Sequence, residues 1–272
     1  MKEAHQMELK QILVFMDNLE HSADRLELAI DLAKRHRAAI MGLKVAVHPL
    51  IPMRRGHDKE EGEELAQLFR EKTAAADVKG EWITADAKAL GGGVVEAISH
   101  YATFADLVIV GQSEHGSTER RATDFLPEKV VFGSGKPVLI VPYAGRHQSV
   151  GRNILVAWKT GRESSRALTD ALPLLRVADS AHIFEVNPSN DEMADMEGLR
   201  RYLASHGVKA QVETSAITEL RVGDVLLNRV ADEGSDLLVM GGYADLHFGT
   251  YVLGDVAKHV LRHMTVPVLM SH

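Results

Sequence analysis

The residues best suited to chemistry in this sequence are two glycines that bracket a loop near its carboxyl end. Gly241 follows an apolar run, and Gly254 comes after a loop of about a dozen residues, in front of a short predicted helix that ends near His263. Glycine lets a backbone approach a phosphate closely, and a helix N-terminus offers free amide donors. This arrangement favours a phosphate-binding loop. A strand-to-helix loop that needs glycine only for its turns would show the same pattern.

Other side chains of interest have simpler explanations. Asp17 follows an apolar run and could cap the turn before the next helix. His259 and His263 have the i, i+4 spacing of two metal ligands, but no third ligand is evident, so we predict surface histidines and no metal site. No His/Asp pattern accompanies Ser164 or Ser165 that would make either a nucleophile. We therefore assign no catalytic residue and expect slow turnover at most.

The segments around these residues occur twice. Residues 106–111 (DLVIVG) are echoed by residues 236–241 (DLLVMG), and residues 137–141 (PVLIV) by residues 267–271 (PVLMS). Both echoes are 130 residues apart, since 236 − 106 = 130 and 267 − 137 = 130. Repeats in one order at one offset indicate a duplicated domain. Units of ~130 residues are large enough to bury a core each.

Each copy reads as a series of βαβ units, because short β-branched runs alternate with stretches of helical period. Strands are expected near residues 12–16, 39–47, 78–83, 107–110 and 138–141, and near residues 154–158, 181–186, 210–214, 237–240 and 266–270. The polar segment 142–149 is the expected linker between domains at residues 1–145 and 150–272. A doubly wound sheet binds ligands where its strand order reverses, so the segments after strands one and four are the candidate site.

Composition limits the classes of function. The 272 residues are 45% hydrophobic and 25% charged, as in ordinary globular proteins. A net charge of −7 argues against non-specific nucleic-acid binding, and no apolar run approaches the ~20 residues of a membrane span. The polar start does not resemble a signal peptide, and the absence of cysteine excludes thiolate catalysis. We expect a cytoplasmic protein.

The strand exits before Gly111 and Gly241, the long loop that ends in Leu253-Gly254 and the terminal Pro-Val-Leu strand resemble the universal stress protein family. The resemblance covers nearly the whole chain as a tandem pair. It implies an α/β fold of two Rossmann-like, doubly wound, five-stranded parallel sheets with strand order 3-2-1-4-5. ATP-binding members resemble one another in a Gly-x2-Gly-x9-Gly-(Ser/Thr) motif after strand four and an aspartate at the end of strand one.

The second copy keeps part of this motif. Gly241 and Gly254 are present, Ala244 stands at the second glycine, and Asp255 stands at the hydroxyl residue. The candidate nucleotide-binding residues implied by the resemblance are Trp158, Lys159, Thr160, Met240, Gly241, Ala244, Gly254, Asp255 and Val256. A carboxylate at Asp255 can satisfy the helix N-terminus itself and would repel a phosphate, unless Lys159 and Arg162 turn inward to offset it.

The first copy keeps a different part of the motif. Asp17 stands at the end of strand one and Gly111 after strand four, which makes them weaker candidates. Glu114 replaces the second glycine, and Asp124-Phe125 replaces the final Gly-Ser. Neither copy carries the complete motif.

These patterns predict a cytoplasmic universal stress protein with a regulatory or protective role, binding ATP or another adenine nucleotide, with Mg²⁺, in the second domain. The alternative is a nucleotide-free interaction module. The fifth strands, near residues 138–141 and 266–270, would lie at sheet edges, which proteins normally cover. Family members cover them by pairing fifth strands across a dimer, so the resemblance implies an internal pseudo-dimer. The sequence does not decide whether the full chain forms a homodimer. No nucleic-acid or membrane partner is predicted.

Overall fold

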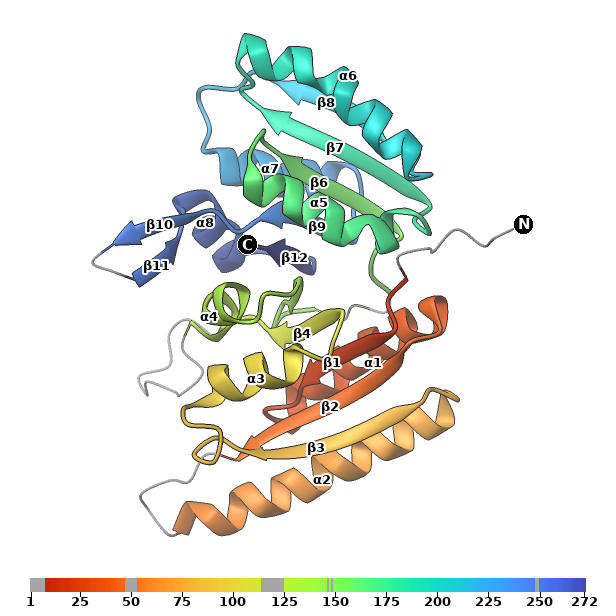
Figure 1. Cartoon of the computed structure of the whole chain (residues 1–272), viewed down its shortest axis with the longest axis vertical. Coiled ribbons are helices and arrows are strands. Elements are labelled where there is room, and N and C mark those ends of the chain that lie inside the picture. The colour runs from red at the N-terminus through yellow and green to blue at the C-terminus, as the bar shows by residue number, and fades with distance from the viewer. Residues whose placement is uncertain (1–7, 47–52, 114–124, 146, 148, 248–249) are drawn as a thin grey trace. The chain divides into compact units, whose positions relative to one another are not determined.

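A computed structural model describes residues 8–46, 53–113, 125–145, 147, 149–247 and 250–272. The chain divides into two compact units, an N-terminal unit at Leu9–Gln148 and a C-terminal unit that includes Ser149–His272. Figure 1 shows that strands and helices alternate along each unit.

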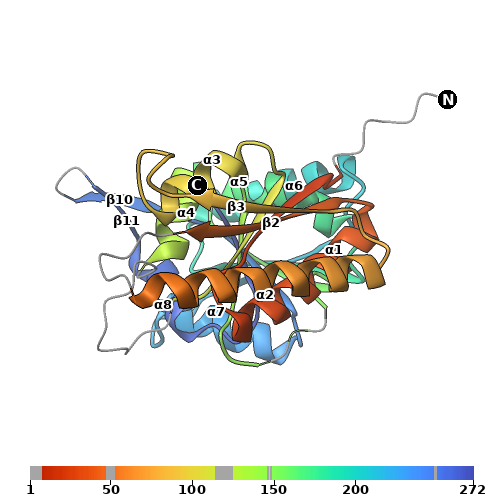
Figure 2. The same ribbon diagram turned by 90° about the horizontal axis from the view of Figure 1, so that it is seen from below.

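The N-terminal unit contains a five-stranded parallel sheet. Its elements are β1 (Gln11–Phe15), α1 (Leu19–His36), β2 (Ala39–Ala46), α2 (Met53–Ala75), β3 (Gly80–Asp86), α3 (Val94–Ala102), β4 (Leu107–Gly111), α4 (Leu126–Gly133) and β5 (Val138–Val141). The strand order is β3-β2-β1-β4-β5. Helices α1 and α2 pack together, as do α3 and α4, and Figure 2 shows the two pairs on opposite sides of the strands. The order therefore reverses between β1 and β4, as we predicted.

The C-terminal unit repeats this architecture. Its elements are β6 (Asn153–Trp158), α5 (Arg162–Leu175), β7 (Ser180–Val186), α6 (Asn190–Ser205), β8 (Gln211–Ser215), α7 (Val222–Asp232), β9 (Leu237–Gly241), β10 (Ala244–His247), β11 (Thr250–Leu253), α8 (Asp255–His263) and β12 (Val268–Ser271). The main sheet of this unit has the parallel order β8-β7-β6-β9-β12. The duplicated doubly wound fold is confirmed.

The central strands of both sheets are apolar on both faces. Ile12, Leu13 and Val14 of β1 are completely buried, as are Leu237 and Val239 of β9. Helices cover both faces of a parallel sheet, so its strands have no side left for polar residues. These strands hold the loops at their carboxyl ends in place.

Tight packing also explains the position of Trp82. Its ring lies 5.6 Å from that of Phe69, centroid to centroid. Both rings fit over Gly42, where an added Cβ would lie 2.7 Å from Phe69 and 2.9 Å from Trp82. Trp82 therefore belongs to the contact between α2 and the sheet.

Two features differ from the expected elements. Strand β3 begins at Gly80 and ends at Asp86, later than expected, and Val47 at the predicted end of strand two lies outside the described residues. The expected loop between Gly241 and Gly254 contains the antiparallel hairpin β10–β11, in which Ala244 pairs with Leu253. Strand β11 consists of threonine, tyrosine, valine and leucine, and the first three have high β-propensity, which explains the hairpin.

Candidate functional site

Two helix N-termini follow β6 and β9, the strands between which the order of the C-terminal sheet reverses. Helix α5 follows β6 and has Gly161 as its N-cap, and α8 follows the hairpin and has Gly254 as its N-cap. Neither N-cap makes a side-chain hydrogen bond to its helix. The first amides of a helix have no partner within it, and its dipole is positive at this end. The arrangement is suited to an anion.

Gly241 is required by helix packing at this edge. A Cβ at this position would lie 2.7 Å from the carbonyl carbon of Glu163 and 2.8 Å from the amide nitrogen of Ser164. Real Cβ atoms do not approach backbone so closely, so any side chain at Gly241 would displace the first turn of α5. This glycine therefore fits the alternative explanation, a structural need, whether or not a phosphate binds nearby.

Gly254 has a looser environment. Its amide donates to the carbonyl oxygen of Tyr243 at 2.9 Å, which closes the base of the hairpin. An added Cβ would lie 3.3 Å from Cδ1 of Tyr243, and the backbone φ of −62° is open to any residue. The Tyr243 side chain is 59% exposed beside this helix start. Sequence reasoning did not single out Tyr243, although an aromatic residue two positions after the strand exit was a visible signal.

Asp255 points into solvent rather than across the helix N-terminus. Its side chain is fully exposed, and the nearest cation is Nζ of Lys258 at 4.0 Å. We predicted that this carboxylate could accept hydrogen bonds from the free amides at the start of α8. The described structure contains no such hydrogen bond. Water screens an exposed charge strongly, so its repulsion of a phosphate is weaker than for a buried group. Val256, the next residue, is also partly exposed.

The remaining candidates of the C-terminal unit differ in access to solvent. Lys159 and Thr160 are exposed after β6, and the side chain of nearby Arg162 is 77% exposed, 3.4 Å from Glu163. Trp158 is half-buried, and its enclosed Nε1 has no hydrogen-bond partner in the described structure. Two other candidates lie inside strands. Met240 is buried in β9, and Ala244 begins β10.

The corresponding edge of the N-terminal unit is filled by Arg25, which sequence reasoning missed. The guanidinium is 3% exposed, and its Nη2 donates to Oδ1 of Asp17 and to Oγ of Ser22. Nη1 lies so close to Gly111 that a Cβ there would overlap it. The guanidinium thus lies between the ends of β1 and β4. Both candidate residues of this unit, Asp17 and Gly111, are in contact with Arg25.

Asp17 does not cap α1, in contrast to the simpler explanation considered above. Asn18 is the N-cap, and its side chain accepts a hydrogen bond from the His21 amide at 2.9 Å. The Asp17 carbonyl oxygen accepts a further bond from Nζ of Lys44 at 2.8 Å. Glu114 and Asp124 lie outside the described residues, whereas Phe125, at the last motif position of this unit, is the exposed N-cap of α4.

His259 and His263 take part in helix contacts. Nε2 of His259 lies 2.6 Å from Oδ1 of Asp224, which joins α8 to α7. Nδ1 of His263 donates to the carbonyl oxygen of His259 at 2.9 Å. Within the described part of the chain, no three histidine, aspartate or glutamate side chains are placed to hold a metal ion. The same part contains no helix long and apolar enough to cross a membrane.

Two doubly wound units, each with its strand order reversing between its first and fourth strands, define a tandem α/β protein of the doubly wound class. The model of the universal stress protein family matches twice, over residues 8–142 and 151–272. The chain therefore belongs to the universal stress protein family, as a tandem pair.

Solved structures agree with this fold. A universal stress protein from Archaeoglobus fulgidus DSM 4304 matches with a TM-score of 0.74 and 21% identity, over 96% of this chain and 95% of that one. A putative universal stress protein from Pseudomonas aeruginosa UCBPP-PA14 matches with a TM-score of 0.62 and 16% identity, over 97% and 93%. Another universal stress protein, solved in complex with cAMP, is 20% identical over 49% of this chain and 96% of that one; its TM-score of 0.36 adds nothing to the evidence for the fold. No curated protein matches the sequence.

Proposed function

We propose that this chain is a regulatory stress protein that binds an adenine nucleotide at the carboxyl edge of its C-terminal unit. Membership of the universal stress protein family supports a stress-related role. The observation that carries the proposed site is the pair of helix N-termini at Gly161 and Gly254, both without a side-chain cap. Backbone amides at such ends bind phosphate groups.

The surrounding charges favour an anionic ligand. Lys159 and Arg162 are exposed near the start of α5, where they can reach phosphate oxygens without losing a buried partner. Asp255 points to solvent, so its carboxylate can accompany a Mg²⁺ ion that arrives with the nucleotide. The adenine base requires an apolar or aromatic surface. Tyr243, exposed beside Gly254, supplies one, and stacking on an aromatic ring contributes about 1–3 kcal/mol per base.

We expect binding with slow hydrolysis at most. Glu163, in the first turn of α5, lies 3.4 Å from the Arg162 side chain, so this carboxylate is paired and not free to act as a general base. A nucleotide held without rapid turnover is suited to sensing and regulation. A cytoplasmic location is part of the same proposal.

Calorimetric titration of the full chain with ATP and AMP, each with and without Mg²⁺, tests the site. The variant Gly254→Glu places a carboxylate among the amides of α8 and should weaken ATP binding at least about tenfold. Gly198→Glu makes the same change in α6, where the nearest atom to an added Cβ is Nη2 of Arg201 at 4.0 Å, and should leave binding unchanged. No heat at millimolar ATP, or equal affinity of Gly254→Glu and the natural chain, would contradict the proposal.

A nucleotide-free interaction module is the second candidate. The contact between Gly241 and the first turn of α5 favours it, because helix packing alone accounts for that glycine. The hairpin β10–β11 would then serve a partner protein. The titration above separates the two functions, since this module predicts no saturable heat with either nucleotide.

We also propose that the two units pair through their fifth strands, β5 and β12. Each is the last strand of its unit's order and is entirely apolar apart from Ser271, so an uncovered edge would favour aggregation. A link of a few residues gives one unit an effective concentration of millimolar order for the other. Removing residues 150–272 should yield a dimer or aggregate in sedimentation. A well-behaved monomer would contradict the pairing, and a dimer of the full chain would show a further contact.

A further inference from the structure

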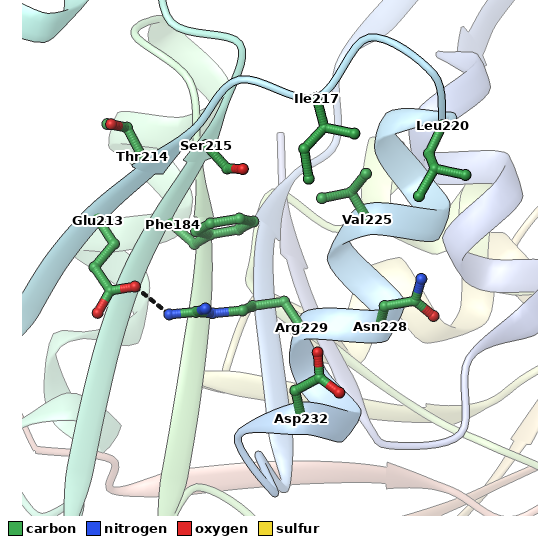
Figure 3. A pocket seen from close by; sticks show the side chains of 10 residues that line it. All are labelled: Phe184, Glu213, Thr214, Ser215, Ile217, Leu220, Val225, Asn228, Arg229 and Asp232. Atoms are coloured by element: carbon green, nitrogen blue, oxygen red, sulfur yellow. Dashed lines mark hydrogen bonds and ion pairs between the residues drawn. The ribbon is translucent and has the colours of Figure 1, made fainter.

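A hollow of about 330 Å³ lies in the C-terminal unit between β7, β8 and α7 (Figure 3). Its volume is within the range of small-molecule sites, ~300–1,000 Å³. Its lining includes no residue of the candidate nucleotide site described above.

One end of the pocket is apolar. Figure 3 shows Ile217, Leu220 and Val225 gathered there, with the ring of Phe184 beside them. Phe184 is 4% exposed and forms the buried base of the pocket, whereas Leu220 is 51% exposed at the rim. A large apolar side chain left in water gains by contact with an apolar ligand. This end can therefore hold the hydrocarbon part of a molecule.

The other end of the pocket carries surplus negative charge. The Arg229 guanidinium lies 5.1 Å from the centre of the Phe184 ring and forms ion pairs with Glu213 and Glu233. Two carboxylates thus share this one cation. Asp232 also lines the pocket and is exposed, and it forms no ion pair with any residue that the structure describes. The pocket offers a carboxylate whose charge is not balanced locally.

The position of this carboxylate is unfavourable for the helix that carries it. Asp232 is the last residue of α7, and Glu233 is the C-cap. A helix is negative at its C-terminus, so acidic side chains there are destabilising. Glu233 is paired with Arg229 one turn earlier, but no such pair in the described part of the chain explains Asp232, and a cation bound in the pocket would reverse the sign of its contribution.

The duplicated unit shows that the fold does not require the acidic lining. In the N-terminal unit, Leu43 of β2 stands opposite Ile83 of β3. At the matching register of the C-terminal unit, Phe184 of β7 stands opposite Glu213 of β8. The same sheet position is therefore apolar in one copy and charged in the other. The negative charge of Glu213 is therefore specific to the C-terminal unit and is not required by the fold.

From these features we infer that the pocket binds a small organic cation, a primary ammonium group on an apolar or aromatic body. The ammonium group donates hydrogen bonds to Asp232 and Glu213, and the body packs on Phe184, Val225 and Leu220. A neutral molecule of the same shape leaves Asp232 without a counter-charge, and an anion is repelled by both carboxylates. The ligand is therefore selected by charge at one end and by shape at the other.

Three probes of nearly equal shape test this assignment on the full chain: 2-phenylethylamine, 2-phenylethanol and 3-phenylpropionate. Dissociation constants from NMR titration should show the amine binding at least about tenfold more tightly than the alcohol, a difference that corresponds to ~1.4 kcal/mol. The carboxylate should show no saturable binding. Equal affinities for amine and alcohol, or no binding of the amine at tens of millimolar, would overturn the inference.

Variants locate the binding in this pocket. Asp232→Asn should weaken the amine at least about fivefold and leave the alcohol unchanged, whereas Asp195→Asn, an exposed aspartate on α6, should change neither. Ser215→Trp fills the pocket from the end of β8 and should abolish binding of both. Amine affinity that is unchanged in Asp232→Asn, or amine binding that persists in Ser215→Trp, would overturn the assignment. ATP titrations should be the same for Asp232→Asn and the natural chain, so the two proposals stand or fall separately.

Discussion

The two units share a fold, but the edges where their strand order reverses are in opposite states. In the N-terminal unit, Arg25 lies between the ends of β1 and β4, where it contacts both Asp17 and Gly111. In the C-terminal unit, two helix N-termini have no side-chain cap, and exposed cations lie close to them. The Arg25 side chain occupies the edge of the N-terminal unit, whereas the edge of the C-terminal unit has free amides and exposed cations that can bind an anion. The comparison shows that a doubly wound fold provides a place for a ligand, while individual side chains decide whether it is open.

The largest expected effect concerns the closed edge. Asp17→Ala leaves the buried Arg25 guanidinium without its counter-ion, and should lower the free energy of unfolding by about 3 kcal/mol. Asp31→Ala removes the partner of Arg35 in a more exposed pair on the same helix, and should cost less than about 1 kcal/mol. Urea denaturation measures both. If the two variants lose the same stability, Arg25 does not depend on Asp17.

A glycine pair distinguishes packing from ligand binding at the open edge. Gly241→Ala forces a Cβ into the backbone of Glu163 and Ser164, and should destabilise the protein by about 1–3 kcal/mol. Gly254→Ala meets nothing closer than Cδ1 of Tyr243 at 3.3 Å, and should have less than half that effect. Thermal or urea unfolding provides the comparison. A reversed order would mean that α5 does not pack on Gly241 as described.

A smaller effect is expected at Asp255. Because its side chain is fully exposed, Asp255→Ser should tighten ATP binding by less than about fivefold. A carboxylate that lay over the helix N-terminus would instead repel the phosphate strongly, and its removal would tighten binding tenfold or more. Calorimetry of this variant decides between the two geometries. A gain of tenfold or more would show that the carboxylate turns inward when the nucleotide binds.

The smallest effect is a pH dependence in the N-terminal unit. Glu96 lies in the first turn of α3. Its carboxylate accepts hydrogen bonds from the backbone amides of Glu96 and Gly93, which hold the pKa of this group below its usual range. A carboxyl group with a lowered folded-state pKa stabilises the protein above its unfolded-state pKa, and this contribution is lost as the pH falls through the folded-state value. Glu96→Gln should therefore flatten the acid side of the stability profile. Urea denaturation at a series of pH values measures this, and Glu60→Gln, the same change at an exposed glutamate of α2, is the control.

The sequence was sufficient for the architecture, because apolar runs such as Ile12–Val14 and their echoes mark strands buried on both faces, and the repeats mark the duplication. The strand order came from the family resemblance. Arg25 was missed because it contacts Asp17 and Gly111 only in the assembled sheet. The spacing of residues in the sequence does not reveal a side chain that reaches from a helix to a neighbouring strand. The direction of Asp255 was missed because it is a rotamer choice, which depends on solvent and Lys258 rather than on residue type.

Photoaffinity labelling of the full chain with an azido-adenine nucleotide tests the central contrast most directly. The account predicts saturable labelling of the C-terminal unit, in peptides that contain Tyr243 or Lys159, that is suppressed by excess ATP and by Gly254→Glu. Peptides around Asp17 and Gly111 should remain unlabelled, because Arg25 fills that edge. Labelling of the N-terminal edge, or labelling that excess ATP does not reduce, would contradict it.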